Sequence, residues 1–302
     1  MKLFAYLAPA ERLDELKREV PSVVATHGRL IVAEGPRLQP AWCHNVWEAP
    51  EEISAVSIGE AARKLRAIQR NWALLDHQDH RRAALIQEQL PKVSAKPLVF
   101  PAPVPTSPLG SWMLVNRDLI LASSQCSSAF PNGEPQFVEP VGPPQPPSAA
   151  YLKLWEALTL FKEHPVPGEK CLDLGACPGG WTWALQRLGA EVVSVDKAPL
   201  APAIAVLPRV KVLKKDAFRM RPEDVGEIDW LFSDVICYPE RLLELVQTWI
   251  AAQPKLRMIC TIKFQGATDF ETVEKFRRIP GSHVQHLFHN KHELTWFRKP
   301  IP

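Results

Sequence analysis

The sequence predicts a mixed α/β protein whose C-terminal half is a mainly parallel sheet with helices on both faces. Short apolar runs, typical of buried strands, alternate with helical stretches after residue 148. The last two runs are separated by only a short polar loop, which predicts an antiparallel final strand. Five parallel strands are expected at 171–174, 192–195, 210–213, 230–232 and 258–262, and the closing pair at 284–288 and 294–297.

Helical stretches fill the gaps between these runs. Ser148 is a candidate cap for a helix that runs to about Lys162. Two further helices are clearest at 181–188 and 240–250, and we expect Trp181 and Trp183 to pack in the core.

The N-terminal half is expected to be a separate α+β region. Its apolar start faintly resembles a signal peptide, but the charged stretch 11–19 follows at once and favours a first strand leading into a helix. Ser57 is a candidate cap for a helix through about Leu75, with Ala61, Leu65, Ile68 and Trp72 on one face. The other expected elements are strands at 3–7 and 28–32, helices at 11–20 and 81–90, and a hairpin of 112–115 with 119–123.

Proline marks the boundary between the two halves. The chain has 30 Pro among 302 residues, about twice the usual ~5%. The run Pro143-Pro144-Gln145-Pro146-Pro147 has a backbone donor only at Gln145 and cannot lie inside a helix. It reads as a stiff linker, so we expect one domain at 1–147 and a second at 148–302.

Composition bounds the class of protein. Apolar residues make up 46% and charged residues 23%, as in globular proteins, and no apolar run approaches the ~20 residues that span a bilayer. The net charge of +3 arises entirely after residue 150, which permits a nucleic-acid partner without requiring one. Scattered cysteines without a Cys-x-x-Cys pair predict no metal site, no disulfides and a reducing, cytoplasmic compartment: Cys43, Cys126, Cys171, Cys177, Cys237 and Cys260.

Acidic and basic side chains follow the predicted strands one after another. In an open parallel sheet, ligands bind beyond the carboxyl ends of the strands. A final antiparallel strand begins, rather than ends, on that same edge. We therefore expect one edge to collect Asp173, Asp196, Asp216, Asp234, Lys263 and Glu293.

The loop Gly175-Ala176-Cys177-Pro178-Gly179-Gly180 follows the first of these strands and opens a helix. Glycines let the backbone approach a ligand, and helix-start N–H groups favour an acceptor-rich one. The loop fails as a dinucleotide fingerprint because Cys177 replaces the glycine nearest the pyrophosphate. S-adenosylmethionine, which has no pyrophosphate, fits better, with Asp196 accepting from ribose hydroxyls and Asp216 from the adenine amino group.

The segment Asp173-Leu174-Gly175-Ala176-Cys177-Pro178-Gly179-Gly180-Trp181 closely resembles the cofactor motif of the FtsJ-like RNA ribose 2′-O-methyltransferases. The resemblance extends over residues 148–298 and implies a Rossmann-like class I methyltransferase sheet. It also implies that the motif residues, together with Asp196, Asp216 and Asp234, bind S-adenosylmethionine. Matches to the family's other motifs imply a catalytic tetrad of Lys153, Asp234, Lys263 and Glu293.

The motif Gly-Ala-Cys-Pro-Gly-Gly-Trp-Thr and the long N-terminal extension are similar to those of one group in this family. That group comprises large-subunit ribosomal RNA methyltransferases that modify a cytidine ribose of 23S rRNA. That resemblance implies an RNA substrate, 23S rRNA. Residues 1–147 are similar in position to the THUMP-type RNA-binding region of that group, and they share its hairpin followed by prolines.

Several alternatives stay open at this point. Helical periodicity alone makes Lys153 an ordinary solvated lysine, and only the resemblance makes it catalytic. Lys263 either loses its proton and acts as a base or stays charged and orients the hydroxyl. The competing functions are methylation of another RNA such as tRNA or a cap, a non-catalytic RNA-binding assembly factor, and a dinucleotide-dependent oxidoreductase, which Cys177 disfavours.

Overall fold

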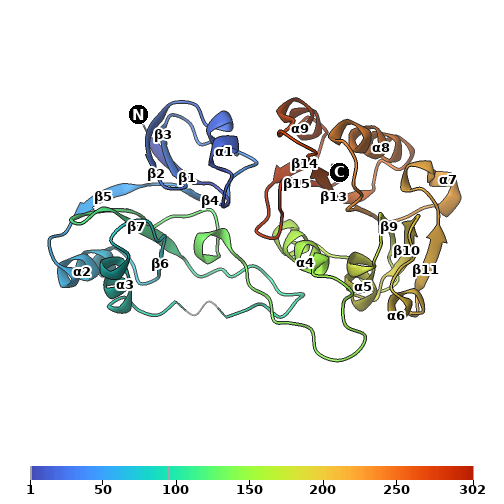
Figure 1. Cartoon of the computed structure of the whole chain (residues 1–302), viewed down its shortest axis with the longest axis horizontal. Coiled ribbons are helices and arrows are strands. Elements are labelled where there is room, and N and C mark those ends of the chain that lie inside the picture. Colours follow the sequence, from blue (N-terminus) through green and yellow to red (C-terminus); the bar gives the residue numbers. More distant parts are fainter. Residues whose placement is uncertain (1, 94–95, 302) are drawn as a thin grey trace. The chain divides into compact units, whose positions relative to one another are not determined.

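The computed structural model describes residues 2–93 and 96–301, and the chain divides into two compact units (Figure 1). The first unit runs to Val99 and continues over Val104–Phe137. The second comprises Phe100–Pro103 and all residues from Val138 onward, so the proline run lies inside the second unit. Among the described residues, no helix combines the length and apolar character that crossing a bilayer requires.

The first unit contains two four-stranded sheets. One has the strand order β2-β3-β1-β4 and is antiparallel throughout, and the other has the order β5-β8-β7-β6 and pairs β6 in parallel with β7. The strands are β1 (Leu3–Leu7), β2 (Val23–His27), β3 (Leu30–Glu34), β4 (Asn45–Trp47), β5 (Glu51–Ser54), β6 (Trp72–Leu74), β7 (Gly110–Asn116) and β8 (Leu119–Ser123). The helices are α1 (Leu13–Glu19), α2 (Ile58–Ile68) and α3 (His80–Glu88), with a short 3₁₀ turn η1 (Pro131–Gly133).

The predicted cap of α2 is present, but the predicted length of that helix is wrong. Ser57 accepts a hydrogen bond from the Glu60 N–H, as an N-cap should. The helix ends at Ile68, and Trp72 lies in strand β6 rather than on the helix face. The Trp72 indole nitrogen donates to the carbonyl of Leu65, 2.9 Å away, so the ring covers the last turn of the helix. The apolar stripe thus continues past the helix because the next strand fills the same core.

The second unit is a seven-stranded sheet of order β11-β10-β9-β12-β13-β15-β14, in which only β15 runs against its neighbours. This arrangement confirms the predicted mainly parallel sheet with an antiparallel last strand. The strands are β9 (Lys170–Leu174), β10 (Glu191–Asp196), β11 (Val210–Lys214), β12 (Trp230–Ser233), β13 (Arg257–Lys263), β14 (Ser282–Gln285) and β15 (Glu293–Arg298).

Helices cover both faces of this sheet. Figure 1 shows α8 and α9 on one side and α4, α5 and α6 on the other. Ser148 does not cap α4, whose first turn has no side-chain cap. The segment predicted as a strand at 284–288 pairs earlier, at Ser282–Gln285. The helices are α4 (Ala150–Phe161), α5 (Gly180–Arg187), α6 (Pro202–Ala205), α7 (Pro222–Val225), α8 (Pro239–Ala252) and α9 (Phe270–Arg277), with a 3₁₀ turn η2 (Ala217–Arg219).

Candidate active site

One edge of the seven-stranded sheet collects the charged residues that follow its strands. β10 ends on Asp196, β13 ends on Lys263, and β15 begins on Glu293. Asp234 directly follows β12, and Asp216 lies just beyond β11. The antiparallel direction of β15 is what brings its first residue to the edge where the parallel strands end.

Lys153, Asp234, Lys263 and Glu293 lie within ion-pair distance of one another. The Lys153 Nζ atom is 3.0 Å from Asp234 Oδ1 and 2.5 Å from Glu293 Oε1. The Lys263 Nζ atom is 3.0 Å from the same Asp234 oxygen and 3.9 Å from Glu293 Oε2. Lys263 and Glu293 are also directly paired across β13 and β15, so their side chains emerge on one face. Two carboxylates therefore hold two ammonium groups side by side.

Lys153 is buried, contrary to the solvated position that periodicity predicts. Its residue is 7% exposed, in a helix that also buries the acidic Glu156. Burial lowers the pKa of Lys153, but the carboxylates of Asp234 and Glu293 outweigh it, and the pKa lies above its ordinary value. Lys153 therefore carries its charge at neutral pH.

Asp234 stays ionised for the complementary reason. Burial raises its pKa, yet the charges of Lys153 and Lys263 outweigh burial, so the pKa lies below the usual value of an aspartate. Its side chain is 19% exposed, which leaves it accessible at the sheet edge. The tetrad is thus a charge-paired cluster with one open side.

Two residues that the sequence analysis missed hold this cluster in place. Glu156 is 2% exposed and accepts hydrogen bonds from the N–H groups of Phe288 at 2.8 Å and His289 at 3.0 Å. Asn290 Nδ2 donates to Glu293 Oε1 at 3.3 Å. Glu156 thereby ties the helix that carries Lys153 to the loop that leads into Glu293. The available signal was an acid inside an otherwise apolar helix, since such acids are rarely buried without partners.

The glycine turn is fastened to the end of β10. The Cys177 N–H donates to Asp196 Oδ2 and the Ala198 N–H donates to Oδ1, both at 2.9 Å. Gly175 has φ +79°, and a Cβ there would lie 2.8 Å from the Val235 Cα atom. Glycine is required because the turn passes so close to the backbone that follows β12.

Asp173 supplies the observation that tests the fit of a methyl donor. It is 1% exposed, and Oδ2 accepts from the Thr182 hydroxyl at 2.7 Å. Among the residues that the structure describes, Oδ1 has no hydrogen-bond partner, and burial raises the pKa of this acid to about 7. A buried acceptor without a donor, at the start of a glycine turn, suits a ligand that brings a cationic N–H group. S-adenosylmethionine has such an ammonium group, so the residues present fit it.

The two acids predicted to contact the adenosine differ in their availability. Each oxygen of Asp196 accepts one backbone N–H, which leaves further lone pairs for ribose hydroxyls. Asp216 Oδ1 accepts from the Phe218 N–H, and Lys197 Nζ lies 2.9 Å from Oδ2 and lowers the pKa of the acid. An adenine amino group at Asp216 therefore competes with Lys197, whose side chain is 74% exposed.

Trp181 and Trp183 lie in the core, as predicted, at 3% and 2% exposure. Their indole nitrogens donate to the carbonyls of Ala150 and Pro144, at 2.9 and 2.8 Å. Trp181 thus anchors the first turn of α4 to α5.

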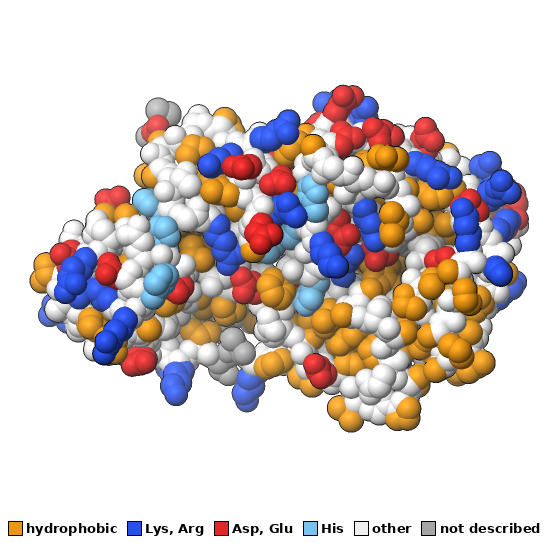
Figure 2. All heavy atoms as spheres, viewed as in Figure 1, with side chains coloured by type: hydrophobic (Ala, Val, Ile, Leu, Met, Phe, Trp, Pro, Cys, Tyr) orange, Lys and Arg blue, Asp and Glu red, His pale blue; other side chains and the backbone are white. Residues whose placement is uncertain are grey.

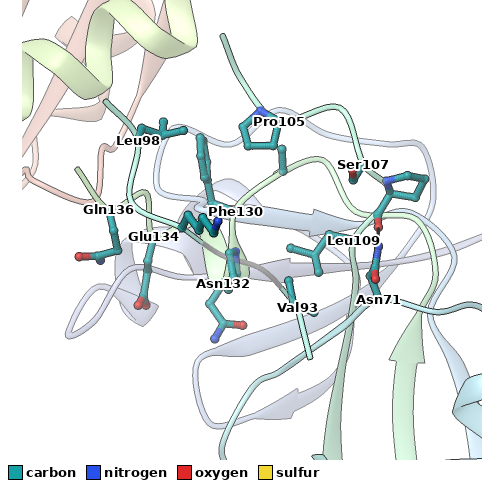
Figure 3. Close-up of a pocket in the computed structure, with 14 residues that line it drawn as sticks. Asn71, Val93, Leu98, Pro105, Ser107, Leu109, Phe130, Asn132, Glu134 and Gln136 are labelled. Carbon is teal, nitrogen blue, oxygen red and sulfur yellow. Dashed lines mark hydrogen bonds between the residues drawn. The ribbon is translucent and has the colours of Figure 1, made fainter. Parts of the chain in front are cut away.

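A separate cavity of about 310 Å³ lies in the first unit (Figure 3). Phe130, Leu98, Pro105 and Leu109 make part of its wall apolar, and Asn132 and Glu134 add polar groups. It contains none of the predicted site residues.

Comparisons with known proteins place the second half of the chain among methyltransferases. Residues 147–291 match the model of the FtsJ-like methyltransferase family. A Ribosomal RNA large subunit methyltransferase M of Halorhodospira halophila is 37% identical over 178 residues, covering 56% of this chain and 51% of that protein. The protein of the same name from Methylococcus capsulatus is 34% identical over 186 residues, covering 57% and 51%. The chain therefore spans about half the length of these curated relatives.

Solved structures give fainter similarities. A Burkholderia thailandensis 1,6-didemethyltoxoflavin-N1-methyltransferase, solved with bound S-adenosylhomocysteine, is 19% identical, with a TM-score of 0.38 over 51% of this chain and 80% of its own.

The family match itself confirms the predicted resemblance, the Rossmann-like methyltransferase fold and S-adenosylmethionine as the methyl donor.

Proposed function

We propose that this chain, whose residues 147–291 form an FtsJ-like methyltransferase domain, methylates a ribose 2′-hydroxyl of RNA, and that its substrate is a cytidine of 23S rRNA. The observation that carries the proposal is the meeting of Lys153 and Lys263 on one oxygen of Asp234, each at 3.0 Å. The names of the relatives support ribosomal RNA as the substrate. The scattered, unpaired cysteines are the basis on which we propose the cytoplasm as the place of action.

The tetrad residues divide the work. When bound, S-adenosylmethionine supplies an electrophilic methyl group on a sulfonium. Lys153 keeps its charge and fixes Asp234 and Glu293, so it is not the proton acceptor. Lys263, whose side chain is 20% exposed, is the more open lysine and is the group we assign to the 2′-hydroxyl. Lys263 orients that hydroxyl, and it accepts the hydroxyl proton only in those molecules in which it has first released its own proton to solvent.

Surface charge supports a modest electrostatic contribution to RNA binding. On the face seen in Figure 2, Lys and Arg side chains alternate with Asp and Glu rather than forming one basic field. The net charge of +3 agrees with this pattern. We therefore propose few phosphate contacts and a correspondingly shallow dependence of RNA affinity on salt. The first unit, residues 1–147 in the predicted division, is proposed as an auxiliary RNA-binding region.

The test is mass spectrometry of nucleosides from 23S rRNA incubated with the protein and S-adenosylmethionine. A 2′-O-methylcytidine that appears only with the active protein is the expected result. Methylation of tRNA or of a cap instead would show that the proposed 23S rRNA substrate is wrong. RNA binding without any methylation would indicate an assembly factor.

The Lys263→Arg variant tests the proton acceptor. Arginine keeps the positive charge but does not lose its proton in proteins. We expect activity to be lost across neutral pH. Retained activity would leave Lys263 with an orienting role only.

A further inference from the structure

Tyr238 is exposed, whereas the other aromatic side chains that the structure describes are buried or half-buried. The sequence has 10 Trp, 3 Tyr and 12 Phe. Among those within the described residues, Tyr238 alone is exposed, at 62%, whereas Tyr6 and Tyr151 are 1% and 7% exposed. The neighbouring Ile236 is 76% exposed. Single exposed apolar side chains are common, but two of them flanking a buried residue on one loop form a patch.

The backbone that carries this patch is held firmly. Tyr238 is the N-cap residue of α8, and its carbonyl accepts from the N–H groups of Arg241 at 3.1 Å and Leu242 at 3.3 Å. Pro239 occupies the first helical position, where its fixed φ suits the helix. Between the two exposed residues, Cys237 is 6% exposed and anchors the loop in the core. The backbone that carries the Tyr238 side chain is therefore held by the start of helix α8.

The patch follows Asp234 of the tetrad closely along the chain. Asp234 begins the segment 234–238, which leaves the carboxyl end of β12 at the edge where the tetrad meets. The charges of Arg241 and Lys263 act on the Cys237 thiol, opposing the burial that raises its pKa to about 11. The residue between Ile236 and Tyr238 is therefore within electrostatic reach of Lys263.

We propose that Tyr238, supported by Ile236, is the stacking platform for the nucleobase of the nucleotide that is methylated. This inference rests on the proposed function and adds how the target nucleotide is held. A ribose at Lys263 carries its base only one glycosidic bond away, and that base loses its neighbours when it enters a site. Stacking on an aromatic ring replaces the lost stacking, and it tolerates any base because each has a π-face. A fixed tyrosine offers that face at a small entropic cost.

The experiment compares variants of the full chain on a 23S rRNA transcript. Tyr238→Ala is expected to raise both the KM and the Kd for the transcript by about tenfold, the effect typical of losing one stacked base. Affinity for S-adenosylmethionine, measured by calorimetry, should stay unchanged. Tyr238→Phe and Tyr238→Trp should keep wild-type values because they keep the π-face. Val206→Ala is the matched control, since Val206 is 81% exposed in the same unit.

Each outcome decides between the two proposals. An unchanged KM and Kd for Tyr238→Ala would overturn the platform. So would a Tyr238→Leu variant that matches Tyr238→Phe, because the contact would then be merely apolar. If the wild-type chain binds the transcript but methylates nothing, the proposed function fails, and the Kd series still measures the platform. If a Tyr238→Ala chain loses only the capture of another protein, the patch is a protein interface and the platform is wrong.

Discussion

The two units of the chain bury different kinds of polar group. Within the described part of the first unit, the buried polar residues are His44, Asn45, Ser111 and Ser123, and no Lys, Arg, Asp or Glu is among them. The second unit buries five charged residues: Lys153, Glu156, Asp173, Glu293 and Arg298.

This difference shows which unit buries charged groups at a cost in stability. Burying a charge is expensive unless it is paired, and a well-packed apolar residue often serves stability as well or better. The first unit follows that rule, with cores of Ala, Leu, Val, Ile and Trp. The second unit departs from it where Lys153, Asp173 and Glu293 gather at the sheet edge. Under the proposed function, charge is kept there because the reaction uses it. The same kind of substitution should therefore have different effects in the two units.

The largest contrast is expected for Asp234→Asn. Both lysines lose the carboxylate that holds them at 3.0 Å, so methylation should fall by about a thousandfold. Single-turnover methylation of the transcript measures it. Asp14→Asn is the matched change in the first unit, where the side chain is 94% exposed, and it should leave the rate unchanged. Equal losses in both variants would break the comparison.

Glu156→Ala should give the next largest effect, on stability. The substitution leaves the N–H groups of Phe288 and His289 without their acceptor and opens a hole under the loop. We expect a loss of about 3 kcal/mol in the free energy of unfolding, measured with urea. Glu51→Ala, on an exposed position of β5, should change it by less than about 0.5 kcal/mol. Similar values for the two would show that burial of the acid is unimportant.

The affinity for S-adenosylmethionine should change with pH around a midpoint near 7, and we expect Asp173 to be the group responsible. Its pKa is raised to about 7, and a cationic methyl donor favours the ionised form. Affinity for S-adenosylmethionine should therefore increase about tenfold from pH 6 to pH 8, and Asp173→Asn should flatten the profile. For the free protein the sign is opposite: stability falls as pH rises towards 7, because the folded state holds this proton more tightly than the unfolded chain. Calorimetry across that range checks both variants, and an unflattened profile would assign the proton elsewhere.

The smallest effect is expected for Ser57→Ala in the first unit. The Glu60 N–H loses its capping acceptor, which should lower stability by about 1 kcal/mol. Methylation per folded molecule should not change. A drop in turnover at full occupancy of the folded state would show that the first unit takes part in the chemistry.

Local patterns predicted the sheet of the second unit well and the sheets of the first unit poorly. A buried parallel strand is a short apolar run, and β9, β10, β12 and β13 all contain buried apolar residues, whereas the edge strand β11 alternates Val or Leu with Lys and is largely exposed. β2 is largely exposed, and β4 and β6 are only three residues long, so none of them gives a usable pattern. The order of strands and turns was enough to bring Asp234, Lys263 and Glu293 to one edge.

Helical periodicity failed at Lys153 for a physical reason. It assumes that the side opposite an apolar stripe faces water, but α4 is buried nearly all round. The residues facing that side are Asp234 and Glu293, which lie far away in sequence. Only the motif resemblance carried that information. Glu156 was missed for the same reason, since its partners are in the loop before β15.

Lys263 pairs directly with Glu293 across β13 and β15, so the register of these two strands determines whether the two side chains meet. Side chains alternate between the faces of a sheet, so inserting or deleting one residue inside either strand would send one partner to the opposite face. Such a change would spare the backbone ladder yet dismantle the reactive cluster. Among homologous chains, insertions and deletions should therefore be absent from β13 and β15, however freely the surface loops differ in length.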